Sequence, residues 1–366
     1  TWQIDQDLYL RSQVFLDRHK IGLAQYENLN EVVRPLMQEI RDDYFLDLTW
    51  FPDKAHQNRF HVVAFATNYS RELWDENDPS FYLQFEDIRY GLDANYNLDI
   101  NDINLLVGGG GLYTRVRGIP FSQTYYPHSG NIYGSVQLPL GEKMNIHAGV
   151  NIAAQGKYTP QINANAGLNF QIAQNQYIDL SVGRTNRFPN SGERFFDFDT
   201  LYGNPDLVPE RHSRIEASYQ FRLDDNWQLQ LDGGYHLVND EIFWNEPYYT
   251  NSENSRDFAY TGLSGGFPLW KFYLKAGGQY TFADLYITSR SSVWGKIHFH
   301  DVWLNGALIF DLYGWAQFYD QHNDLFFDPR MDRFYVGDQI TEAYQVLNWK
   351  AAATIKEARI FFEMDN

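Results

Sequence analysis

The sequence predicts an all-β fold, a large antiparallel transmembrane β-barrel of about 16–22 strands. Three observations support it: apolar and polar residues alternate along many segments, long apolar runs are missing, and aromatic residues are frequent. Successive side chains of a strand point to opposite faces, so strict alternation gives a strand one apolar and one polar face. A sheet with lipid outside and a hydrated lumen inside needs strands of this kind.

Composition narrows the class of protein. The chain has 366 residues, enough for one large barrel or two ordinary domains. Its mean hydropathy of -0.49 is too polar for a helical membrane protein, and no run of about 18 apolar residues is present. Aromatic residues make up 17% of the chain, which suits the aromatic girdles of a barrel at the two bilayer interfaces. A large soluble β-protein with aromatic cross-strand pairs is the alternative interpretation.

Charge and cysteine content indicate a location. The formal net charge of -18 argues against a nucleic-acid partner, because few Lys and Arg are left to neutralise phosphates. The chain has no cysteine, which agrees with a protein that crosses the oxidising periplasm. We therefore expect the outer membrane of a Gram-negative bacterium, with lipid and lipopolysaccharide as neighbours. No signal peptide precedes Thr1, which indicates a mature or partial chain.

Residues 161–172 are the clearest predicted strand. Their apolar face is formed by Ile162, Ala164, Ala166, Leu168, Phe170 and Ile172. In residues 214–222, Glu216 lies between Ile215 and Ala217. A carboxylate has a low free-energy cost only where it contacts water. Glu216 and the residues on its side of the strand are therefore expected to face the lumen. The same alternation predicts strands at residues 87–98, 144–154, 177–184, 227–237 and 271–282.

The first part of the chain is less regular. Residues 2–16, 43–51 and 58–69 have the pattern of strands, whereas residues 17–41 do not. Within this stretch, residues 29–40 (LNEVVRPLMQEI) predict a short helix in a loop. The sequence has no domain break, low-complexity linker or repeat, so residues 1–366 are expected to form one barrel.

The connections between the predicted strands alternate in length. Short turns lie near Asp99 and at residues 140–143, 173–176, 223–226 and 355–357. Long connections lie at residues 117–130, 186–212, 238–256 and 321–342. Short periplasmic turns and long external loops are typical of outer-membrane barrels.

The long connection between two clear strands carries a distinctive motif. Residues 185–221 combine an Arg-x-Pro segment and a nearby Glu with a Gly-Asn-Pro-x-Leu-x-Pro-Glu segment, followed by a Glu in the next strand. The motif residues are Arg187, Pro189, Glu193, Gly203, Asn204, Pro205, Leu207, Pro209, Glu210 and Glu216. The prolines stiffen the loop, Gly203-Asn204 supplies a turn, and an inward ionic pair of Glu210 and Arg211 is expected to anchor it. These features indicate residues that fix barrel geometry rather than contact a solute.

This motif resembles the mid-barrel signature of TonB-dependent outer-membrane receptors. The resemblance implies a barrel for uptake of a small solute, a plug domain, and energy supplied by the inner-membrane TonB complex. No plug or TonB-contacting segment is recognisable, so we expect the barrel portion of a receptor or a plugless relative. Residues 327–339 (FDPRMDRFYVGDQ) resemble Bacteroidetes-type porins. Residues 348–366 resemble the last full hairpin of receptor barrels, which predicts that a final strand is missing from this chain.

The sequence predicts no enzyme, no metal site and no cofactor. No serine elbow or zincin signature is present. His298 and His300 lie on one face of a predicted strand, but two ligands are too few for a metal site. The glycines at 108–111 lead into another strand rather than a helix, so they predict a bend or close packing against a plug and not a phosphate loop.

Two aromatic loops are the candidate solute-binding surface. Residues 121–130 and 242–251 mix Tyr, Trp, Asn and carboxylates, a combination that suits sugars, peptides or chelates. The candidate binding residues are Tyr125, Tyr126, His128, Trp244, Tyr248 and Tyr249. The alternative is that these loops pack on each other as a cap.

Three functional hypotheses follow from these observations. The first is a TonB-dependent receptor-like barrel for uptake of a small solute. The second is a plugless passive porin. The third is a scaffold barrel in a larger outer-membrane complex, with a surface lipoprotein or other subunits as partners.

We expect the purified polypeptide to require detergent or lipid to stay monodisperse, because one face of every span is built for hydrocarbon. Size-exclusion chromatography with and without detergent checks this expectation. A single sharp peak in plain buffer, without affinity for lipid vesicles, would be incompatible with a membrane barrel.

Overall fold

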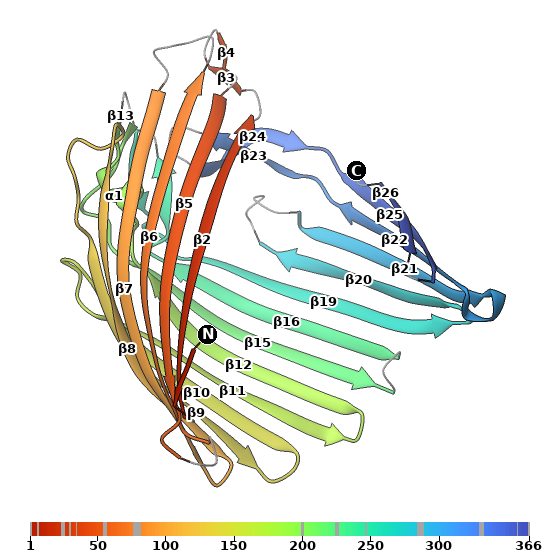
Figure 1. Ribbon diagram of the computed structural model, residues 1–366. Helices are drawn as coiled ribbons and strands as arrows, with labels where there is room; N and C mark the ends of the chain where they lie inside the picture. Colours follow the sequence, from red (N-terminus) through yellow and green to blue (C-terminus); the bar gives the residue numbers. More distant parts are fainter. Residues whose placement is uncertain are drawn as a thin grey trace.

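The computed structural model describes most of the chain. The described residues are 2–5, 7–22, 26–28, 31–33, 35–53, 57–75, 82–198, 201–223, 227–245, 247–283, 289–328, 333–356 and 358–364. Eighteen strands form one antiparallel sheet that curves into a barrel wall (Figure 1). This confirms the predicted fold class and strand number. In this part of the chain, no helix is long and apolar enough to cross a membrane.

Each strand of the sheet pairs with the next one along the chain. The strands are β1 (Trp2–Asp5), β2 (Leu8–Gly22), β5 (Pro35–Trp50), β6 (Arg59–Asp75), β7 (Tyr82–Ile100), β8 (Ile103–Gly118), β9 (His128–Leu140), β10 (Met144–Gln155), β11 (Gln161–Ala173), β12 (Gln176–Arg187), β15 (Glu210–Arg222), β16 (Gln228–Asn239), β19 (Arg256–Leu269), β20 (Phe272–Phe282), β21 (Ser291–Trp303), β22 (Leu308–Tyr319), β25 (Tyr344–Ile355) and β26 (Ala358–Met364). Among the described strands β26 pairs only with β25, so the wall is open between its first and last strands (Figure 1).

The remaining elements lie in the connections. They are β3 (Tyr26–Asn28), β4 (Glu31–Val33), α1 (Ser191–Phe195), β13 (Asp197–Phe198), β14 (Leu201–Tyr202), β17 (Ile242–Asn245), β18 (Tyr248–Asn251), η1 (Leu304–Gly306), β23 (His322–Asp328) and β24 (Arg333–Thr341). The connection predicted at residues 321–342 is therefore largely a hairpin of β23 and β24.

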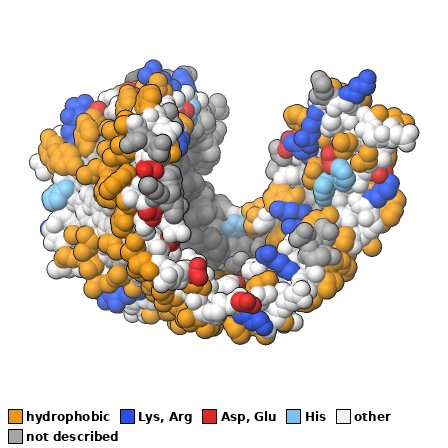
Figure 2. All heavy atoms as spheres, turned by 60° about the horizontal axis from the view of Figure 1, so that its bottom comes forward, with side chains coloured by type: hydrophobic (Ala, Val, Ile, Leu, Met, Phe, Trp, Pro, Cys, Tyr) orange, Lys and Arg blue, Asp and Glu red, His pale blue; other side chains and the backbone are white. Residues whose placement is uncertain are grey.

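The two faces of the wall follow the predicted parity. Between β11 and β12, Leu168 lies opposite Leu180 and Asn169 lies opposite Asp179, so apolar and polar residues are sorted to separate faces. Apolar side chains such as Ile162 and Ile215 are 57% and 61% exposed on the outer face. Figure 2 shows hydrophobic side chains along the outer contour of the wall. This surface is suited to contact with hydrocarbon.

Aromatic rings gather near the short turns of the second half of the wall. Trp227 stacks on Phe267, with ring centroids 5.4 Å apart, and both lie within three residues of a strand end. Trp303 stacks on Phe310 at 5.7 Å beside the η1 turn. Such rings are stable at a membrane–water interface, where the apolar body is buried and the polar edge stays wet.

The turn between β7 and β8 shows how the short connections form. Asn101 and Asp102 have φ angles of 49° and 69°, the left-handed conformation that both central residues of a type I′ turn require. Asn and Asp adopt it more readily than other side chains because they hydrogen-bond locally. The turn residues therefore fix the register of this hairpin.

The helix predicted at residues 29–40 is wrong. The chain there contains β4 and the beginning of β5. Leu36 to Ile40 pair with Gly22 to Arg18 of β2, and on the other side with Trp74 to Ser70 of β6. Two long ladders of backbone hydrogen bonds outweigh the small local preference for a helix, which amounts to less than about 1 kcal/mol per residue.

The four glycines at 108–111 lie inside β8. Close packing occurs there against a side chain of the neighbouring strand β9, and the predicted packing against a plug stays a prediction. A Cβ atom at Gly108 would lie 2.6 Å from the ring of Tyr133, which covers this position from β9. The Tyr133 hydroxyl donates a hydrogen bond of 2.9 Å to Asp93 on β7. The missing side chain thus lets a ring cross the inner face of β8 and tie three strands together.

A charge placed on the outer face should destabilise the barrel. Val182 is 52% exposed near the middle of β12. We expect Val182→Arg to lower the free energy of unfolding in lipid vesicles by about 2–4 kcal/mol, measured by urea titration. The matched control is Ser181→Arg, on the inner face 3.3 Å from Glu216, which should cost less than about 1 kcal/mol. Equal losses for the two variants would mean that the faces are misassigned.

Candidate functional site

An ionic cluster joins the long-loop ends of β12 and β15. Arg187, the last residue of β12, lies directly opposite Glu210, the first residue of β15. Its guanidinium donates two parallel hydrogen bonds of 2.7 Å to the two oxygens of Glu210. Its third nitrogen, Nη1, contacts both oxygens of Glu193 at 3.0 and 2.9 Å. One arginine therefore holds two carboxylates, in the fork geometry that makes such pairs strong.

Glu193 and Glu210 are both almost fully buried, at 5% and 4% exposure. Glu193 lies in the short helix α1, where Asn190 forms a reciprocal capping box with it. The Glu193 N–H donates to Asn190 Oδ1 at 2.8 Å, and the Asn190 N–H donates to Glu193 Oε2 at 2.9 Å. Glu210 also accepts a bond of 2.7 Å from the Ile242 N–H. Buried carboxylates are tolerated here because every oxygen has partners.

The ionic pair predicted between Glu210 and Arg211 is wrong. Arg211 binds Asp240 instead, with its Nη2 2.6 Å from the carboxylate. Adjacent residues of a strand point to opposite faces, so two neighbours cannot share one inward site. The inward partner of Glu210 comes from the other side of the loop, which joins the two ends of the connection.

The Gly-Asn-Pro segment packs on this cluster. A Cβ atom at Gly203 would lie 2.5 Å from the backbone of Arg194, so only glycine fits against the end of α1. The Asn204 N–H donates to the Glu193 carbonyl at 2.8 Å, and the Asn204 amide donates to the Tyr249 carbonyl at 2.9 Å. The Pro205 carbonyl accepts a bond of 2.5 Å from Lys157 Nζ. The segment thus connects three loops.

The other motif residues fill the space around the cluster. Leu207 is 1% exposed and packs against Ile242 and Tyr249, with Trp244 beside them. Pro189 is fully buried, and Pro209 is half-buried. Glu216 lies lower on the inner face of β15, where it contacts Ser181, His236 and Tyr260. Glu216 is therefore part of the wall and not of the loop cluster.

The loops after β12 and β16 merge into one small sheet. β14 pairs in parallel with β18, and this joins the hairpins β13–β14 and β17–β18 into four strands. Tyr249 is 4% exposed and meets Trp244 edge to face at 4.9 Å. Tyr248 is 52% exposed and stacks on Tyr202 at 5.6 Å. Of these three candidate binding residues, only Tyr248 is presented at the surface of the cap.

The loop after β8 joins the same assembly. Tyr125 stacks on Phe195 of α1, with the ring centroids 3.9 Å apart and the planes nearly parallel. Tyr126 is 54% exposed and lies 6.2 Å from the ring of Tyr113. Arg194 of α1 lies 5.1 Å from the centre of the Tyr158 ring, which belongs to the loop after β10. Burial raises the pKa of the Tyr158 hydroxyl, and the Arg194 charge acts against this shift.

A cavity of about 510 Å³ lies between this loop assembly and the inner face of the wall. Its floor comes from β6, β7 and β8, its side from β9, and its roof from the segment at residues 188–196. The residues that give it chemical character are Tyr69, Asp87, Arg89, His128, Phe188 and Asn190. Aromatic rings beside a few polar groups are typical of sites for small molecules, and the volume is in the usual range.

His128 is the one candidate binding residue from the two aromatic loops that lines this cavity. Tyr69, Asp87 and Arg89 are not among the candidate binding residues that the sequence predicts. The alternation within residues 87–98 puts Asp87 and Arg89 on the polar face of the strand, which is the face expected toward the lumen. The register of β6 to β9 places these strands side by side, and the cavity lining brings these residues together with the roof segment.

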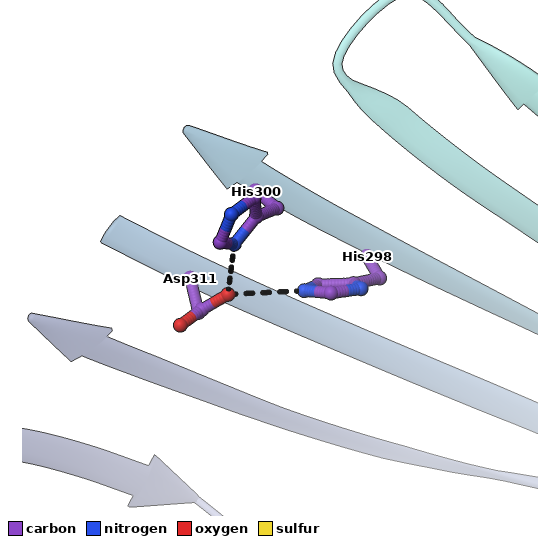
Figure 3. A group of neighbouring side chains, drawn as sticks. All are labelled: His298, His300 and Asp311. Atoms are coloured by element: carbon purple, nitrogen blue, oxygen red, sulfur yellow. Dashed lines mark hydrogen bonds and ion pairs between the residues drawn. The ribbon is translucent and has the colours of Figure 1, made fainter. Parts of the chain in front are cut away.

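The structure also adds a third side chain to the histidine pair on β21. Asp311 of β22 lies beside His298 and His300, and the ligand atoms of all three are within 4.8 Å of one another (Figure 3). Two imidazoles and a carboxylate form a donor set found in many metal sites. Register alone brings Asp311 to this position, so the sequence contained no direct signal for it.

A curved antiparallel wall with an apolar outer face, a polar inner face and loops folded over one end defines an outer-membrane transport barrel. The chain belongs to the family described as "Putative porin", whose profile matches residues 14–366. This family and the fold place the protein in the outer membrane of a Gram-negative bacterium. No curated protein matches the chain.

Solved structures show the same fold. The chain is similar to the copper transporter OprC, with a TM-score of 0.77, 12% identity, and coverage of 100% of this chain and 64% of that one. It is also similar to the siderophore receptor PirA from Acinetobacter baumannii, with a TM-score of 0.73, 12% identity, and coverage of 98% of this chain and 64% of that one. The FrpB iron transporter from Neisseria meningitidis gives a TM-score of 0.74, 10% identity, and coverage of 100% of this chain and 65% of that one. These likenesses confirm that the chain has the barrel fold of such outer-membrane receptors and transporters, and the chain spans less than two thirds of each of these proteins.

Removing Arg187 should open the loop assembly. Arg187→Ala leaves two buried carboxylates without their cation, which we expect to cost about 2–3 kcal/mol, since Arg187 itself is partly exposed. Cleavage by chymotrypsin after Phe195 or Phe196 should then become roughly 30- to 160-fold faster.

The matched control for this prediction is Arg211→Ala. Arg211 is 46% exposed in its ion pair with Asp240, so its loss should cost less than about 1 kcal/mol and change cleavage little. Equal cleavage rates in the two variants would contradict the structural role given to Arg187.

Proposed function

We propose that this chain is the barrel of an outer-membrane transporter that takes up a small solute and is energised by the TonB complex. In this proposal residues 1–366 form one barrel domain, and the TonB complex acts through a plug domain of the full-length protein. The solute is first held in the cavity between the wall and the loop assembly. No covalent chemistry is involved: the protein supplies a wall, a gate and a binding surface.

The observation that carries this proposal is the ordered roof over the cavity. The Arg187, Glu193 and Glu210 cluster holds the β12–β15 connection and bonds the Ile242 N–H of the β16 loop. The Tyr125–Phe195 stack and the β14–β18 pairing join the long loops after β8, β12 and β16, and the segment at residues 188–196 lies over the inner face of β6 to β9. A passive pore gains nothing from a rigid roof, whereas a receptor needs preorganised groups to capture a dilute solute. The similar structures include a copper transporter, an iron transporter and a siderophore receptor, which supports the same class of function.

The cavity favours a small solute that has a flat or apolar surface to pack against aromatic rings and polar groups to form hydrogen bonds. Arg89 lies in it with its Nε 2.8 Å from Asp87, and His128 faces it from β9. These groups provide hydrogen-bond donors and an acceptor beside Phe188 and Phe121. Chelates, sugars and short peptides combine such features. Among the six aromatic-loop candidates, we propose His128 as a contact in the cavity and Tyr126 and Tyr248 as contacts at the outer surface.

The second candidate function is a plugless passive porin, which the family description favours. Conductance of the full natural polypeptide in planar lipid bilayers separates the two. We expect no stable open step in the absence of TonB, because a plugged receptor closes its lumen. A persistent open step would contradict the receptor proposal and support the porin. A subunit that co-purifies in detergent with a closed barrel would support the scaffold role instead.

A further inference from the structure

A group of two histidines and one aspartate lies on the inner face of the wall, far from the loop assembly. His298 and His300 are two residues apart on β21, so both point to the same face. Asp311 lies directly opposite His300 on β22. Its Oδ1 atom is 3.2 Å from His298 Nε2 and 2.8 Å from His300 Nδ1. Figure 3 shows both rings turned toward this one oxygen.

The spacing of these atoms is close to that of a metal coordination shell. Ligands bound tetrahedrally at about 2.0–2.2 Å around one ion are roughly 3.3–3.6 Å from their neighbours. The two nitrogen–oxygen separations, 3.2 and 2.8 Å, are shorter than this, so a bound ion would replace the two contacts to Asp311 and spread the three ligand atoms slightly. All three atoms are within 4.8 Å of one another. The His300 side chain is 52% exposed, so its ring has room to adjust to a bound ion.

The surroundings hold two of the ligands in place and leave one side open. The His298 ring stacks on Tyr313 at 4.1 Å with an angle of 10° between the planes. The Asp311 side chain is 13% exposed and flanked by the buried Ala352 of β25. His300 faces the lumen. A metal bound here would keep positions free for water or for a further ligand, as in open three-ligand sites.

Other histidines of the wall lack this arrangement. His61 lies 3.0 Å from Asp47, and His236 lies 3.4 Å from Glu216. In each case one imidazole lies beside one carboxylate, and a single hydrogen bond accounts for their short distance. Over the part of the chain that the structure describes, only the β21–β22 group brings three such ligand atoms within reach of one ion.

We propose that His298, His300 and Asp311 bind a divalent transition metal of the zinc and copper class. Imidazole nitrogen suits these ions, whereas magnesium and calcium prefer oxygen ligands alone. The site is a few residues from the η1 turn, at the end of the lumen opposite the loop assembly. This inference rests on local geometry and stands independently of the proposed solute uptake.

Zinc titration of the detergent-purified protein tests the site. We expect one Zn²⁺ per chain by isothermal calorimetry, with affinity reduced about tenfold or more in His298→Gln, His300→Gln and Asp311→Asn. The matched control is His236→Gln, which removes another imidazole of the inner face and should bind Zn²⁺ like the natural sequence. Heat-modifiable mobility in gels verifies that each variant is folded. Absence of binding, or equal binding in all variants, overturns the proposal.

A second measurement needs no substitution. Diethylpyrocarbonate modifies accessible imidazoles, and peptide mass spectrometry locates the modified residues. We expect Zn²⁺ to protect His300 and His298 from modification while His236 is modified at an unchanged rate. Equal modification of all three histidines with and without Zn²⁺ would count against the site even if the variants failed to fold.

Discussion

The need to pair every backbone N–H and C=O group away from water determines this structure. In hydrocarbon an unpaired group costs several kcal/mol, so only helices or continuous strand ladders can span a membrane. This chain uses the second solution, in which each strand bonds its sequence neighbours through antiparallel ladders of up to sixteen paired residues. The period-two sorting of side chains, the short turns and the curved wall all follow from that ladder.

Because the backbone is fully paired within the sheet, charged and metal-ligating side chains can be placed on the inner face of the wall. A charge on the outer face would meet lipid, but the inner face is hydrated or filled with polar protein. The structure accordingly places carboxylates such as Glu39 and Glu216 inward, each with several partners from neighbouring strands. The same freedom permits histidines there, and the register of β21 and β22 brings two of them to Asp311.

The loop assembly solves a different problem, because it lies beyond the ladder and must hold its own shape. It does so with few apolar contacts, chiefly Leu207 with Ile242 and Tyr249, and with one buried ionic cluster. A buried charge group of this kind is weak evidence for stability, but removing one partner leaves a buried charge without compensation. The cluster therefore favours the one loop arrangement in which Arg187 reaches both carboxylates.

The sequence alone determined the elements whose signal is local. Alternation identified the long strands and their faces, the turn residues marked the short connections, and the spacing of Arg187, Glu193 and Glu210 marked a motif. These predictions succeed because neighbouring side chains of a strand point to opposite faces, so two or three consecutive residues already indicate which face is apolar. The same local view predicted a helix at residues 29–40, where pairing with β2 and β6 prevails.

Only the tertiary structure decided which side chains meet. Arg187 binds Glu210 across a loop of 22 intervening residues, Tyr69 lines one cavity with the roof segment, and Asp311 joins His298 and His300. Each of these contacts depends on strand register and on how a long loop returns to the wall. A shift of one residue in register would reverse the faces and disperse all three groups, and no pattern within a single segment records that register.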